Sequence, residues 1–191
     1  MTGVILLDKL ADILQGELEE VKLRTKGGEF RSPVVFRQHL PLPRTPKVKP
    51  RGGKQEEEPP QPPEEYGPED FDANFPCVIV QLQDWNDTRE IATAEINFLI
   101  GVYDDNPNAQ GYRDVENIKD HIRLYLHQNQ TIDRRYIMQF PLRGGLFKDQ
   151  PWPVFFGWIT ATYALDNPAA EIKRRKGDWR DGTYPTKPEP R

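Results

Sequence analysis

The sequence is divided by a stretch rich in proline and charge, which runs from Pro41 to Pro68 and holds nearly half of the chain's 19 prolines. Its basic block comprises Arg44, Lys47, Lys49, Arg51 and Lys54, and the acidic block that follows comprises Glu56, Glu57, Glu58, Glu64, Glu65, Glu69, Asp70 and Asp72. Such a segment has too few apolar groups to offset its own ordering entropy, and its prolines favour an extended backbone. We interpret about 41–74 as an insertion into one fold that is ordered by a partner, with a disordered linker as the alternative.

Composition limits both the core and the choice of partner. Hydrophobic residues make up 36% of the 191 and charged residues 29%, with a mean hydropathy of -0.77, so we expect a folded core smaller than the chain. The net charge of -4 argues against a dedicated DNA-binding protein, which presents a strongly basic face. No apolar run approaches the ~18 residues of a membrane span, and the N-terminus lacks the basic start of a signal peptide. The sequence therefore predicts a soluble protein without a membrane partner.

Two stretches carry apolar residues at helical spacing. The first comprises Leu7, Leu10, Leu14, Leu18 and Val21, and the second comprises Val115, Ile118, Ile122 and Tyr125. This spacing predicts amphipathic helices over about 4–24 and 111–128, each with one buried stripe.

The remaining apolar runs read as strands. Cys77–Gln83 and Glu90–Tyr103 are expected to pair antiparallel through a turn at 85–88, and Tyr136–Leu142 and Val154–Leu165 through a turn that includes 144–145. A shorter patch at 34–36 is a strand or an edge segment. Ile96, Phe98, Ile100 and Val102 alternate and define one buried face. At least one of the neighbours Phe155 and Phe156 must point away from the main core.

Together these elements predict an α+β fold: a small, mostly antiparallel sheet with two main amphipathic helices packed against it. We expect a single domain over 1–165, interrupted by the insertion, followed by an extended C-terminal arm over 166–191.

Few residues suggest chemistry. Gly52-Gly53 and Gly144-Gly145 lack the spacing of a phosphate-binding loop, and His39, His121, His127 and Cys77 are too scattered for a zinc site. Cys77 lies in an apolar run and is expected to pack as a small hydrophobe, in keeping with a reducing cytoplasm. Asp84 with Asp87, and Asp104 with Asp105, are paired acids that can bind Mg²⁺, but they fall in expected turns where Asp bonds locally. We expect no enzyme, cofactor or metal.

Three phrases carry a resemblance to a known family. They are Phe75-Pro76-Cys77-Val78-Ile79-Val80, then Gly101-Val102-Tyr103-Asp104-Asp105 followed by Gly111-Tyr112-Arg113-Asp114-Val115, and finally Pro151-Trp152-Pro153-Val154-Phe155-Phe156-Gly157. In their order and spacing, over roughly 75–165, they resemble the tail-terminator or tail-completion proteins of long-tailed bacteriophages and related prophages. The insertion and the arm depart from the shorter members of that family.

The resemblance implies a structural virion protein in the tail and neck, assembled in the cytoplasm of a bacterial host. It implies a closed, hexameric ring that caps the tail tube, ends its growth and offers a surface to the head-side neck protein. The sheath protein is a further partner if the tail is contractile. Genomic DNA passes through the ring lumen without specific binding, which suits an acidic protein. We expect the insertion and the arm to become ordered in the assembled virion.

Other readings remain open. The nearest is a different neck component, a head-completion or stopper protein. Pro59-Pro60-Gln61-Pro62-Pro63 permits a proline-rich adaptor that binds SH3-like domains. A metal-dependent nuclease using Asp84, Asp104 and Asp105 is the enzymatic alternative.

The candidate interface residues are large or charged groups at exposed ends of the expected sheet. They are Trp85 in the first hairpin turn, Arg143 and Trp152 in the last one, and Lys173, Arg174, Arg175 and Trp179 in the arm. The basic cluster at 173–176 is expected to be solvated or to contact an acidic neighbour rather than nucleic acid.

Overall fold

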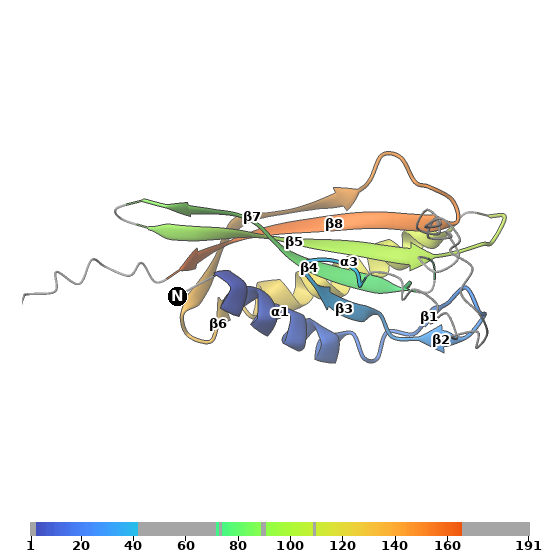
Figure 1. The fold of residues 1–191 in the computed structure, drawn as a ribbon, viewed down its shortest axis with the longest axis horizontal. Helices are drawn as coiled ribbons and strands as arrows, with labels where there is room; N and C mark the ends of the chain where they lie inside the picture. Colours follow the sequence, from blue (N-terminus) through green and yellow to red (C-terminus); the bar gives the residue numbers. More distant parts are fainter. Residues whose placement is uncertain (1–2, 42–71, 73, 89–90, 109, 166–191) are drawn as a thin grey trace, which may run out of the picture.

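The computed structural model describes residues 3–41, 72, 74–88, 91–108 and 110–165. Its elements are α1 (Gly3–Glu17), β1 (Leu23–Arg24), β2 (Phe30–Arg31), β3 (Val34–Arg37), β4 (Cys77–Asp87), β5 (Ala92–Tyr103), α3 (Gly111–Gln128), β6 (Thr131–Ile132), β7 (Tyr136–Leu146) and β8 (Val154–Leu165). The expected α+β class, with two helices against a mostly antiparallel sheet, is confirmed (Figure 1). Most of the proline-rich insertion and all of the C-terminal arm lie outside the described residues.

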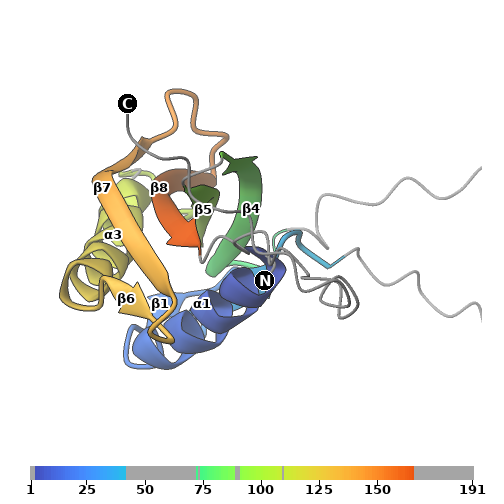
Figure 2. The same cartoon turned by 90° about the vertical axis from the view of Figure 1, so that its left-hand side faces the viewer.

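The main sheet has six strands in the order β3-β4-β5-β8-β7-β6. All neighbours are antiparallel except β3 and β4, which run parallel although the proline-rich stretch separates them in the chain. Parallel neighbours need a long connection, and residues 38–76 supply it. The sheet curls, and both helices lie on its inner side (Figure 2).

The long strands β4, β5 and β8 give the sheet two ends. At one end Cys77 pairs with Gly101, and at the other Ala92 pairs with both Asp87 and Leu165. We name these the groove end and the hairpin end. At the hairpin end, β4 and β5 extend past the helices (Figure 1).

The alternation in β5 produces the expected buried face. Ile96, Phe98, Ile100 and Val102 are fully buried, and they pack with Val78 and Val80 of β4 against the helices. The residues between them point to the opposite face, which no helix of the described residues covers. We name it the open face. It is polar at Glu95 and Asn97 and becomes apolar towards the groove end, where Leu99 and Gly101 lie.

The two helices use the predicted stripes with one correction. In α3, Val115, Ile118 and Ile122 are buried, as the spacing predicts, whereas the predicted Tyr125 is only half-buried and Leu126 beside it is buried instead. The helix expected to reach Arg24 instead ends at Glu17. The reason is that Leu23 and Arg24 pair with Arg31 and Phe30 in a separate two-stranded sheet, which the sequence analysis did not foresee.

Both expected hairpin turns lie elsewhere. The first was expected at 85–88, but β4 continues to Asp87, and Thr88 closes the turn by hydrogen bonds with Ile91. A bulge between Leu82 and Asp84 lets the strand continue in a new register, with Trp85 opposite Ala94. Gly144 and Gly145, expected in the second turn, lie inside β7 and pair with Ile159 and Trp158.

The two edges of the sheet differ. At the β3 edge, the Gln15 side chain of α1 accepts a hydrogen bond from the Val35 amide at 2.8 Å and donates one to the Pro33 carbonyl at 3.3 Å. Arg37 in the same strand is paired with Asp8 at 3.2 Å and with Asp12 of the helix. At the other edge β6 pairs only with the start of β7, so no described strand lies along the outer side of β7 from Gln139 onwards.

Candidate interaction surfaces

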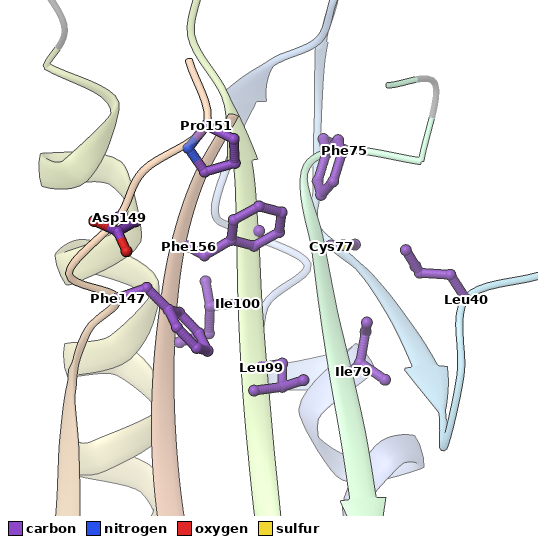
Figure 3. Close-up of a pocket in the computed structure, with 11 residues that line it drawn as sticks. Leu40, Phe75, Cys77, Ile79, Leu99, Ile100, Phe147, Asp149, Pro151 and Phe156 are labelled. Carbon is purple, nitrogen blue, oxygen red and sulfur yellow. The ribbon is translucent and has the colours of Figure 1, made fainter. Parts of the chain in front are cut away.

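A groove of about 330 Å³ opens on the open face at the groove end (Figure 3). It lies between Leu40 after β3, the first residues of β4, the end of β5 and the loop from β7 to β8. Its lining residues are Leu40, Phe75, Cys77, Ile79, Leu99, Ile100, Gly101, Phe147, Asp149, Pro151 and Phe156. Most are apolar, and Asp149 is the one charged side chain among these lining residues.

Three aromatic rings shape the groove, and a glycine makes room for them. Phe156 lies edge-on to Phe75, with ring centroids 5.7 Å apart, and edge-on to Phe147 at 6.4 Å. A Cβ added at Gly101 would stand 2.4 Å from a carbon of the Phe75 ring, so only glycine allows this approach. Phe155, the neighbour of Phe156, points into the main core, which confirms that the pair divides between the two faces.

Hydrogen bonds fix the rim of the groove. The Gln150 side-chain amide donates to the carbonyls of Phe147 and Phe156 at 2.7 and 2.9 Å, and its oxygen accepts from the Phe156 amide at 2.6 Å. On the opposite rim Arg31 donates to the Phe75 carbonyl at 2.8 Å. The groove is therefore largely preformed, which lowers the entropic cost of filling it.

Cys77 lies at the floor of the groove and is 1% exposed. Burial raises the pKa of its thiol to about 12, so the thiol stays protonated near neutral pH. Because the thiolate is the nucleophile, this environment makes a poor reactive centre, and Cys77 packs as the expected small hydrophobe.

A second cleft, of about 250 Å³, lies between α3 and β7. Its lining residues are Lys119, Asp120, Arg123, His127, Leu142, Arg143, Gly144 and Ile159. Two of its cations are paired within the helix, Lys119 with Glu116 at 2.6 Å and Arg123 with Asp120 at 3.1 Å. The third cation, Arg143, forms no ion pair within the described part of the chain, so the cleft carries one positive charge beyond these two pairs.

The structure places the described interface candidates far apart. Trp85 lies at the hairpin end and is 64% exposed, but in β4 rather than in a turn. Arg143 lies inside β7 opposite Thr160, again not in a turn, because the glycines after it continue the strand. Trp152 is 62% exposed in the loop before β8, at the groove end. Lys173, Arg174, Arg175 and Trp179 lie outside the described residues.

The acids considered for Mg²⁺ are also separated. Asp84 pairs in register with Glu95, and nine residues of β5 at about 3.3 Å each put it roughly 30 Å from Asp104. Asp104 accepts a local hydrogen bond from the Asn106 amide, and Asp105 pairs with Arg24 at 3.5 Å. Within the described ranges, no group of three or more His, Cys, Asp or Glu could hold a metal ion.

The groove was not foreseen as a site, although the sequence carried one signal. Gly101 replaces a side chain in the middle of an otherwise regular strand, and such a glycine marks a place where another group approaches closely. No sequence pattern marked Asp149, because it lies in the loop between β7 and β8, where residues follow no regular spacing.

No family model matches the chain, and no curated protein matches it. In the part of the chain that the structure describes, no helix has the length and apolar character of a membrane span. The fold and its surfaces define a class only, an α+β domain whose curled sheet is covered by helices on one face and carries an apolar groove on the other.

Proposed function

We propose that this chain is a tail terminator, a structural subunit of a ring that caps the tail tube of a long-tailed bacteriophage, stops its elongation and connects it to the head-side neck. One observation carries the proposal. The three phrases that resemble tail-terminator proteins are distant in the sequence, yet Phe75, Gly101 and Phe156, one from each, line the same groove. A shared surface is a reason for these phrases to occur together.

The distribution of exposed apolar groups supports a ring. A ring is built from a head-to-tail contact, in which one patch meets a different patch on the next copy. The groove lies at one end of the sheet, and Trp85 and Ile91, which are 64% and 54% exposed, lie at the other. A chain with two unlike apolar ends suits this kind of contact better than a two-fold dimer, which uses one patch twice.

Particles that lack the protein test the role. We expect headless tails of abnormal length in electron micrographs, because nothing stops the growth of the tube. Complementation with the wild-type chain should restore normal tails. Full heads that leak DNA beside tails of normal length would contradict the proposal and assign the protein to head completion or to a stopper.

The mass of the purified protein in solution tests the ring separately. A hexamer has six times the chain mass of 22.2 kDa. A stable two-fold dimer at all concentrations would contradict a head-to-tail ring.

A further inference from the structure

The groove selects the chemistry of its occupant. Its walls are aromatic and aliphatic, and its single charged lining residue, Asp149, is a carboxylate at the rim. A ligand that fills it must bring an apolar side chain, and a cation beside that side chain gains an ion pair with Asp149. An occupant that brings net negative charge to the rim is repelled.

Trp85 lies at the hairpin end, and Trp179 belongs to the arm that follows β8 in the sequence; the charges around the two tryptophans differ. Trp85 is flanked by Asp84 and followed by Asp87, with no cation in 84–87, so it brings net negative charge. Trp179 has Asp178 on one side and Arg180 on the other, and residues 172–180 together carry five basic residues and one acid. The carboxylate at the groove rim therefore favours the arm over the hairpin.

The topology favours the arm of a neighbour over a chain's own arm. β8 begins beside the groove and runs to Leu165, and the nine steps from Phe156 to Leu165 cover about 30 Å. β8 therefore runs away from the groove of its own copy and ends at the hairpin end. The 14 residues from Leu165 to Trp179 span at most about 50 Å when fully extended, enough to reach a neighbouring copy. In a head-to-tail ring the hairpin end of one copy faces the groove end of the next.

We propose that the groove of each copy binds residues 172–180 of the C-terminal arm of the next copy, with Trp179 in the apolar groove and Arg180 against Asp149. This inference rests on the proposed ring. One side of the ring contact is then the preformed groove of one copy. The other side is an extended segment of the next copy, a mode of binding that is common in protein–peptide recognition.

A cross-linking experiment with the full chain tests the contact. Cys77 is the only cysteine, so Cys77→Ala provides a background without thiols. In that background, one version carries Phe147→Cys at the groove rim and a second carries Gly177→Cys, which leaves Trp179 and Arg180 in place. After mixing and mild oxidation, we expect a disulfide-linked pair of two chains, with the two cysteine peptides joined in mass spectra. Because each version has one thiol, this product forms only between copies.

A matched control replaces Phe147→Cys by Ile137→Cys. The two side chains are similarly exposed, at 44% and 50%, but Ile137 lies towards the hairpin end, opposite Ala164. We expect little product from Ile137→Cys. Adding Asp149→Lys to the groove version should lower the yield several-fold, whereas Asp105→Lys, outside the groove, should leave it unchanged. Equal yields from the two cysteine positions would overturn the inference.

Three further results would also overturn it. The first is a link that forms only within one chain carrying both Phe147→Cys and Gly177→Cys, which would show that the arm folds back. The second is a link from Phe147→Cys to a cysteine at Val48 in place of one at Gly177, which would assign the groove to the proline-rich stretch. The third is that no link forms between copies, whether or not the mass in solution shows a ring. The protein could still form a ring without this link, and particles that lack the protein could still carry tails of abnormal length. These two results together would reject only this contact and leave the tail-terminator role intact.

Discussion

The two faces of β5 show how one strand serves two purposes. On the helix side Ile96, Phe98 and Ile100 are fully buried and apolar without interruption. On the open face polar Asn97 gives way to apolar Leu99 only at the groove end. The helices require the first pattern, because a sheet packs only through an apolar face. The second pattern contributes to a smaller cluster of Phe75, Cys77, Tyr103 and Val154, against which Phe156 packs. The proposed contact with a neighbouring copy would cover the apolar groups that this cluster leaves partly exposed.

The comparison is tested most strongly by truncating one residue on each face. Phe98→Ala should lower the free energy of unfolding by about 3–5 kcal/mol, since it removes a fully buried ring from the core. Leu99→Ala should cost about 1 kcal/mol, because its side chain is only partly buried. Urea unfolding with an unchanged slope measures both. Equal losses would mean that the open face is part of the core.

Glycine substitutions give the next largest effect. Gly101→Ala should destabilise the fold by about 1–3 kcal/mol, because the new methyl group meets the buried Phe75 ring. Gly16→Ala in α1 is the control, since nothing lies within 4 Å of its added Cβ, and it should stabilise by up to about 1 kcal/mol. Thermal unfolding of the two variants should therefore shift in opposite directions. A neutral Gly101→Ala would show that the Phe75 ring moves aside freely.

The reactivity of Cys77 tests whether the floor of the groove is closed. With its pKa raised to about 12 by burial, the thiol is almost wholly protonated at pH 8, so alkylation by iodoacetamide should be slow in the folded protein. In urea, where the pKa returns to the usual range, alkylation should become fast. Comparable rates in the two states would place Cys77 in contact with solvent.

The smallest effect is expected at the helix side of the groove end. Burial, and then the nearby Asp104 carboxylate, raises the pKa of Asp114, so folding favours its protonated form. Its contribution to stability is thus present below the unfolded pKa and is lost as the pH rises through the folded pKa. Asp114→Asn should be slightly more stable than the wild type at neutral pH, and the difference should shrink towards acidic pH. Denaturant midpoints at several pH values measure it, and a gap that widens on acidification would give the opposite sign.

Local pattern predicted much of the fold. The alternation of Ile96 to Val102 and the stripe of Val115, Ile118 and Ile122 each depend on neighbours in the sequence, and the structure confirms both. The turn near Trp85 was misplaced because a bulge is not visible in composition. The parallel pairing of β3 with β4 joins residues about forty positions apart, and no local signal encodes it.

The groove was beyond sequence reasoning for the same reason. It needs Phe75, Gly101 and Phe156 to meet across three strands and needs a loop to bring Asp149 to the rim. Apart from Gly101, which interrupts a regular strand, none of these residues stands out in its own stretch. Only the register of the strands, which follows from the whole sheet, makes them neighbours.

The hydrogen bonds of Gln15 have a consequence for growth of the protein into fibres. Strand-by-strand polymerisation needs two free edges on each molecule, one to receive and one to extend. Gln15 occupies backbone groups of the β3 edge, while the outer side of β7 has no described strand beside it. Pairing through β7 therefore joins two molecules and stops, so crowding in the cell should not turn this sheet into an endless filament.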